Sequence, residues 1–268
     1  MVKRDSITSS DASKFGQMIG EAFQRVVYAF IKSYLAEKYE RYELLEPEEG
    51  RKLVTLEMLG GTSRQLDSVI IPKKLRNQPI ALLETKWLKD ARHHNDKGAW
   101  ILQLREVRNR FPTVRGAAAI LAGYWTEAVG VMFLTEGGVK MVWVATDEEV
   151  YSTLQKPLND FLGDNTLTLD AKAMRQKYER PSDLTHFIVA LNATGILDNI
   201  ATMWLAFPKK APNGVVITGA DLIRYAIDQL LAPLPENPGV QHLEIALQIT
   251  TGNRILRNLK ILSLHLSS

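Results

Sequence analysis

Residues 117–125, AAAILAGYW, form an apolar run without a single charged side chain. The run is far too short to span a membrane, so its side chains have to be buried within the protein. A strand that is apolar on both faces is typical of the middle of a sheet with helices packed on either side. This stretch therefore predicts an α/β core.

The segment before this strand is expected to supply a long helix and several further strands. Apolar side chains recur every three or four positions, which predicts a helix from about Ser13 to about Tyr42. Strands are expected within residues 51–59, 64–72 and 79–87, which are rich in aliphatic side chains and separated by polar turns. A second helix then buries one apolar face, formed by Trp100, Ile101, Leu104 and Val107.

The segment after residue 125 is expected to begin with two strands around an EGG turn, within residues 129–146. Thr146 and Glu149 have the spacing of a capping box, which predicts the start of a helix. Residues 171–207 are predicted to be mainly helical. The tail alternates between apolar and polar residues around a TTGNR sequence, which predicts a late β-hairpin.

These elements together predict a single domain over residues 1–268 with an α/β fold. Its centre is a mixed sheet flanked by helices, followed by a largely helical C-terminal addition with the late β-hairpin. Strands and helices do not alternate strictly along the chain, so a doubly wound sheet is not expected. The catalytic core is expected at about 13–145, and the additional elements at about 146–268.

Composition excludes several classes of function but identifies none. The 268 residues contain 33 Lys and Arg against 30 Asp and Glu, a net charge of +3 that is too small to indicate nucleic-acid binding. No cysteine is present, which excludes disulfides, thiolate metal sites and cysteine nucleophiles. The first residues lack the apolar core of a signal peptide, so a soluble cytoplasmic protein without membrane association is expected.

A charged pair interrupts the apolar strand predicted at residues 79–87. Glu84 and Lys86 lie two positions apart, so their side chains are expected to point to the same face of the strand. Burying such charges is costly, and the alternative is a solvated edge strand. If residues 64–72 pair with this strand antiparallel, Asp67 lies opposite Glu84. Three charged groups would then converge on one side of the sheet.

Two neighbouring carboxylates repel each other unless a cation lies between them. Oxygen ligands without histidine or cysteine favour magnesium, which is held partly by substrate phosphates. A lysine beside the metal can orient the attacking water, while the metal polarises the scissile phosphate. Asp67, Glu84 and Lys86 are therefore candidate catalytic residues for phosphodiester hydrolysis, and Asp67 and Glu84 are candidate metal ligands.

Asp67 followed by the ETK sequence at residues 84–86 resembles the motif of the PD-(D/E)XK nuclease superfamily. The resemblance covers roughly residues 13–125, in the expected order of helix, strand hairpin, helix and strand, although Leu66 replaces the proline of the motif. It implies a restriction-endonuclease-like core, magnesium as cofactor and no organic cofactor. It also implies a catalytic role for Glu21 on the first helix, and phosphate or DNA contacts by Gln103, Arg105 and Arg108. The alternative is that Glu21 is an ordinary polar residue at the margin of the apolar stripe and Gln103 a plain surface glutamine.

Among members of this superfamily, the chain most resembles a type II restriction endonuclease. Such enzymes cut double-stranded DNA at specific sequences, usually as homodimers. The part of the chain beyond the core suits sequence recognition, and Val107 stands where RecB-type exonucleases carry a tyrosine. The alternatives are a structure-specific or repair nuclease of the same superfamily, and a DNA-binding protein without catalysis.

Further DNA contacts are expected at two groups of polar residues outside the motif. Lys73 and Lys74 form a basic cluster that could track phosphates. Near the predicted hairpin tip, Asn253, Arg254 and Arg257 are of the residue types that read base edges. The alternative is that both groups are ordinary solvated surface.

Overall fold

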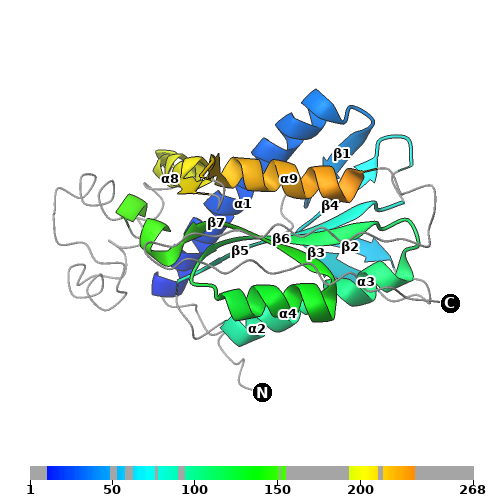
Figure 1. The fold of residues 1–268 in the computed structure, drawn as a ribbon, viewed down its shortest axis with the longest axis horizontal. Coiled ribbons are helices and arrows are strands. Elements are labelled where there is room, and N and C mark those ends of the chain that lie inside the picture. Colours follow the sequence, from blue (N-terminus) through cyan, green and yellow to red (C-terminus); the bar gives the residue numbers. More distant parts are fainter. Residues whose placement is uncertain are drawn as a thin grey trace, which may run out of the picture.

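The structure is a computed structural model that describes residues 11–48, 53–57, 63–75, 78–89, 94–150, 152–154, 193–210 and 214–232. A five-stranded sheet of order β1-β4-β5-β6-β7 lies at its centre (Figure 1). Neighbouring strands are antiparallel from β1 to β5 and parallel from β5 to β7, so the sheet is mixed as expected. Its strands are β1 (Tyr42–Leu45), β4 (Ser68–Pro72), β5 (Ala81–Leu88), β6 (Gly116–Gly123) and β7 (Val139–Thr146).

Helices cover both faces of this sheet (Figure 1). On one face pack α1 (Asp11–Lys38), α8 (Ile196–Ala206) and α9 (Gly219–Leu231). On the other lie α2 (His94–Leu102), α3 (Leu104–Arg110) and α4 (Glu127–Gly137). Every residue of β6 is buried, which confirms the prediction from its apolar sequence. The α/β fold class is therefore confirmed.

Two small two-stranded sheets accompany the central one. The first pairs β2 (Val54–Glu57) with β3 (Ser63–Leu66), and β3 runs into β4 through a bend at Asp67. The second pairs β8 (Pro208–Lys210) with β9 (Val216–Thr218), just before α9. The hairpin predicted around TTGNR and most of the helical region predicted at 171–207 lie outside the described residues.

One strand prediction was wrong, because residues 127–137 form the helix α4. Parallel strands require a crossover, and α4 supplies it between β6 and β7. Its buried residues Gly130, Phe133 and Gly137 follow helical spacing, but surrounding apolar residues hide this period in the sequence. The EGG sequence ends the helix, since Gly138 adopts a left-handed conformation with φ of 59°.

The predicted end of the first helix was also wrong. The helix α1 stops at Lys38, residues 39–41 connect it to the sheet through a turn, and Tyr42 already belongs to β1. Tyr42 and Leu44 are buried while their neighbours are less so, a period of two that belongs to a strand paired with β4. The aromatic and apolar residues there fit either pattern, so the sequence did not resolve the boundary.

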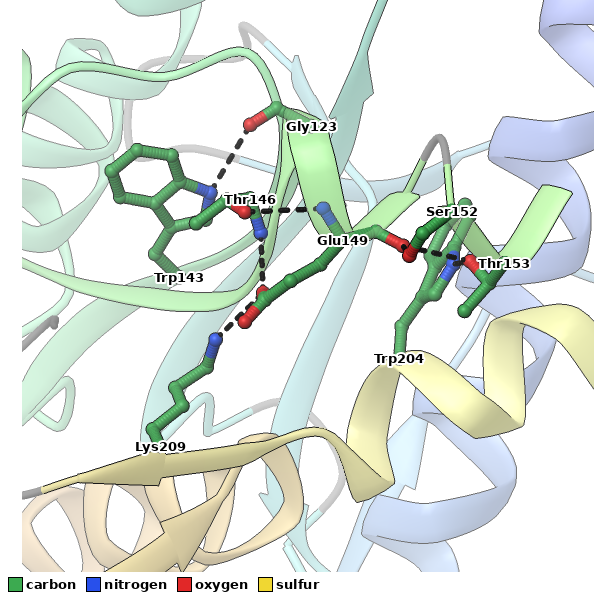
Figure 2. A network of polar contacts seen from close by, with 8 residues as sticks. All are labelled: Gly123, Trp143, Thr146, Glu149, Ser152, Thr153, Trp204 and Lys209. Atoms are coloured by element: carbon green, nitrogen blue, oxygen red, sulfur yellow. Dashed lines mark hydrogen bonds and ion pairs between the residues drawn. The ribbon is translucent and has the colours of Figure 1, made fainter. Parts of the chain in front are cut away.

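A polar network ties the C-terminal elements to the end of β7 (Figure 2). The Oε2 atom of Glu149 accepts hydrogen bonds from the Thr146 backbone N–H at 2.8 Å and from Lys209 Nζ at 2.9 Å. The Glu149 N–H donates to Thr146 Oγ1, which confirms the predicted capping box. Trp204 of α8 donates to Thr153 Oγ1 at 2.7 Å. This network fixes α8 and β8 against the sheet.

Candidate active site

The two charged segments of the motif meet where β4 separates from β5. The antiparallel pairing ends at Ser68 and Leu83, and the same register places Asp67 opposite Glu84. At this point the chain bends away toward β3, so β5 continues beside β6 without β4. The predicted pairing and convergence of Asp67, Glu84 and Lys86 are both confirmed.

The side chains of these three residues are in direct contact. Lys86 Nζ lies 2.5 Å from Asp67 Oδ2 and 2.8 Å from Glu84 Oε2, bridging the two carboxylates. The Thr85 backbone N–H also donates to Asp67 Oδ2, at 2.8 Å. The β5 strand has lost its neighbour β4 at this point. The Asp67 carboxylate therefore accepts the hydrogen bond of the Thr85 N–H in place of a strand partner.

Burial gives this cluster unusual electrostatics. The Glu84 side chain is fully buried, and this desolvation together with repulsion from Asp67 raises its pKa to about 7. Burial by itself would lower the pKa of Lys86, but the charges of Glu84 and Asp67 outweigh it and raise that pKa. Lys86 therefore stays protonated at neutral pH. With 18% of its side chain exposed, it is also the most accessible of the three residues.

The carboxylates fit a divalent metal ion such as magnesium. Both are hard oxygen donors, and the ammonium group of Lys86 already occupies a cation position between them. Glu84 Oε2 is buried and lies 2.8 Å from the ammonium group of Lys86, so a metal ion bound here would take the position of that ammonium. Within the described part of the chain, no group of three or more His, Asp or Glu side chains assembles that could hold a metal. Asp67 and Glu84 would therefore supply two ligands.

The first helix reaches this site through a residue that the sequence did not single out. The hydroxyl of Tyr28 donates to the backbone carbonyl of Asp67 at 2.6 Å, and Gln24 Nε2 donates to that hydroxyl. Glu21, the predicted catalytic residue of α1, is exposed and lies seven positions before Tyr28, on the same side of the helix. It does not join the carboxylate pair in a metal-binding group. Helical spacing from Glu21 was the signal that could have pointed to Tyr28.

The predicted phosphate contacts on the second helix have other partners in the structure. Arg105 donates to the carbonyl of Glu136 at 2.8 Å and Arg108 to that of Gly138 at 3.5 Å, so both hold the C-terminal end of α4. Gln103 is exposed at the junction of α2 and α3. A role for these three residues in DNA binding remains a prediction.

The remaining candidate DNA contacts lie apart from the motif. Lys73 and Lys74 are exposed in the turn after β4, roughly 20 Å along the strand from Asp67. Asn253, Arg254 and Arg257 lie outside the described residues. By contrast, the β2–β3 sheet immediately precedes Asp67, and Arg64 stacks over the Trp100 ring at 4.8 Å, which anchors β3 to α2.

Comparison with known proteins found no relative of this chain. No family model matches the chain, and no match was found among curated proteins or solved structures. Among the helices that the structure describes, none combines the length and apolar character needed to cross a membrane. Inferences about function therefore depend on the residues of the site.

Proposed function

We propose that this protein is a magnesium-dependent endonuclease that hydrolyses phosphodiester bonds in double-stranded DNA at specific sequences, as type II restriction endonucleases do. The observation that carries the proposal is the contact between Asp67, Glu84 and Lys86 at the divergence of β4 and β5. A buried pair of carboxylates with one lysine is an expensive arrangement for stability alone. Metal-dependent hydrolysis of a phosphodiester would give these three groups a common use.

Each residue has a distinct task in this reaction. Asp67 and Glu84 would hold the metal through the carboxylate oxygens that now contact Lys86. When bound, magnesium polarises the scissile phosphate and offsets the charge on the leaving oxygen. Lys86 would give up its position between the carboxylates to the metal and orient the attacking water.

The C-terminal elements support a role in sequence recognition. The helices α8 and α9 and the β8–β9 sheet follow the three charged residues in the chain, and α8 and α9 pack on the same face of the central sheet as α1. An addition of this kind suits recognition of a DNA sequence, with two copies of the chain cutting the two strands of a symmetric site.

A plasmid cleavage assay tests the catalytic part of this proposal. Supercoiled DNA is incubated with wild-type protein, Asp67→Asn, Glu84→Gln or Lys86→Met, with magnesium or EDTA. We expect each variant to lose at least about a thousandfold in rate and the double variant Asp67→Asn/Glu84→Gln to lose little more, because residues acting as a unit are not additive.

The matched control for this assay is Glu46→Gln, which removes an exposed carboxylate that pairs with Lys32. It should cleave at the wild-type rate. Cleavage that continues in EDTA, or that survives in Glu84→Gln, contradicts the proposal. Cleavage confined to junctions indicates a repair nuclease, and DNA retardation without cleavage indicates a binding protein.

A further inference from the structure

Asp67 stands at a bend between two strands, so its backbone lacks the regular partners of a sheet. Every buried backbone N–H and C=O needs a partner, and here side chains provide them. The Asp67 N–H faces Glu84 Oε1 at a long 3.4 Å, whereas its carbonyl accepts a short hydrogen bond of 2.6 Å from Tyr28. The stronger restraint on the backbone of this residue therefore comes from α1.

Tyr28 is well suited to act as a fixed donor. It is buried at the middle of α1, and Gln24, one turn earlier, donates to its hydroxyl at 2.5 Å. With that lone pair occupied, the phenolic proton is directed to the carbonyl of Asp67. Burial, and then the negative charge of Asp67, raise the pKa of Tyr28, so the donor keeps its proton throughout the neutral range.

We propose that Tyr28, supported by Gln24, is a positioning residue that sets the geometry of the metal site by fixing the backbone of Asp67. This inference rests on the proposed function, since it assigns Tyr28 a task in metal binding by Asp67 and Glu84. The Asp67 carboxylate comes from the bend before β4 and the Glu84 carboxylate from β5, and the pairing of β4 with β5 ends one residue away from each of them. The hydrogen bond from α1 holds the backbone of Asp67 in place of a sheet contact and, together with the hydrogen bond from the Thr85 N–H to Asp67 Oδ2, keeps the carboxylate opposite Glu84.

A comparison of two tyrosine-to-phenylalanine variants separates this role from a contribution to stability. Tyr34, six residues later on the same helix, also donates a 2.6 Å hydrogen bond, but to Asp228 of α9. Tyr28→Phe and Tyr34→Phe thus remove the same atom and a hydrogen bond of equal length. Only the first variant affects Asp67, so differences between the two report on the site.

Two readouts measure the metal site: the magnesium concentration for half-maximal DNA cleavage, and the magnesium concentration for the half-maximal rise in melting temperature without DNA. We expect Tyr28→Phe to raise both about tenfold, and Tyr34→Phe to change them by less than about twofold. Gln24→Leu, which keeps the phenol in place, should raise both about threefold.

The outcomes distinguish this inference from the proposed function. If Tyr28→Phe and Gln24→Leu both match Tyr34→Phe in magnesium dependence, the inference is overturned. If wild-type protein binds magnesium but cleaves no DNA, the proposed function fails, and the thermal readout still decides the role of Tyr28. If Tyr28→Phe does not fold, Gln24→Leu decides: a raised magnesium requirement supports the role, and an unchanged one overturns it.

Discussion

The buried carboxylate of Glu84 makes a quantitative prediction about stability. Its pKa is raised from 4.5 to about 7, a difference that corresponds to ~3 kcal/mol at 1.36 kcal/mol per pH unit. The side chain is fully buried, so solvent does not screen this cost. In the metal-free protein, the charged form of Glu84 therefore opposes folding.

The sign of the pH dependence follows from proton binding. Between pH 4.5 and about 7 the folded protein holds a proton on Glu84 that the unfolded chain has released. Stability from this group is present at low pH, is lost as the pH rises through about 7, and stays lost above it. Between pH 5 and pH 8 we expect the free energy of unfolding to fall by about 2–3 kcal/mol on account of Glu84.

Glu84→Gln removes this titration while keeping the shape of the side chain. The free energy of unfolding is measured by urea denaturation with EDTA present, at pH 5 and at pH 8. Its fall from pH 5 to pH 8 should be about 2–3 kcal/mol smaller in the variant than in wild type. Lys86 keeps its contact with Asp67 Oδ2 in the variant, so it retains a partner. Relative to wild type, Glu84→Gln should thus gain stability at pH 8 and at the same time lose DNA cleavage.

The control for this measurement is Glu46→Gln, in which an exposed carboxylate is lost. Its pH dependence should match wild type within about 0.5 kcal/mol. A fall in stability from pH 5 to pH 8 that is the same in Glu84→Gln as in wild type would refute the reasoning.

Three further predictions concern the metal and the fold. Magnesium at a hundred times its dissociation constant should stabilise the wild type by about 2.7 kcal/mol and leave Asp67→Asn unchanged in thermal melting; equal shifts would place the metal elsewhere. Glu149→Ala leaves the buried Lys209 unpaired and should lower the free energy of unfolding by about 3 kcal/mol in urea denaturation, whereas Lys209→Met should lower it less. The reverse order would contradict the network of Figure 2. Gly123→Ala should lower the free energy of unfolding by at least about 2 kcal/mol in the same assay, since φ is 84° and the added Cβ would lie 2.0 Å from the Leu88 carbonyl oxygen. A variant as stable as wild type would show that this close approach of Gly123 to Leu88 is absent.

The sequence predicted the charged site because the site depends on strand register. Glu84 and Lys86 interrupt an apolar run, and the antiparallel pairing brings Asp67 opposite Glu84 once the turn between the strands is located. Alternation along a strand has a fixed period of two, so both the face and the partner could be worked out. Convergence of the three residues followed directly.

Elements without such a period were harder to predict. The helix α4 is apolar around most of its circumference, so its sequence resembles that of a buried strand, and only the need for a crossover between β6 and β7 excludes one. The contacts of Arg105 and Arg108 with the end of α4 depend on that misassigned helix. Long-range contacts of this kind arise from packing and leave no local pattern.

The role of Tyr28 was missed for a related reason. In the sequence it is one of many aromatic residues on an amphipathic helix, and its apolar ring accounts for its burial. The partner of its hydroxyl is the backbone carbonyl of Asp67, which the bend leaves without a strand partner, and the sequence does not reveal that bend. The prediction had placed the contribution of α1 at Glu21, two helical turns away.

The most direct measurement of the central claim is digestion of unmethylated phage DNA by wild-type protein and by Glu84→Gln, with and without magnesium. We expect a fixed ladder of fragments that requires magnesium and is absent with the variant. A magnesium-dependent smear would contradict sequence specificity while leaving the nuclease in place. Intact DNA with wild-type protein, or the same ladder from the variant, would contradict the assignment of Asp67, Glu84 and Lys86 as the active site.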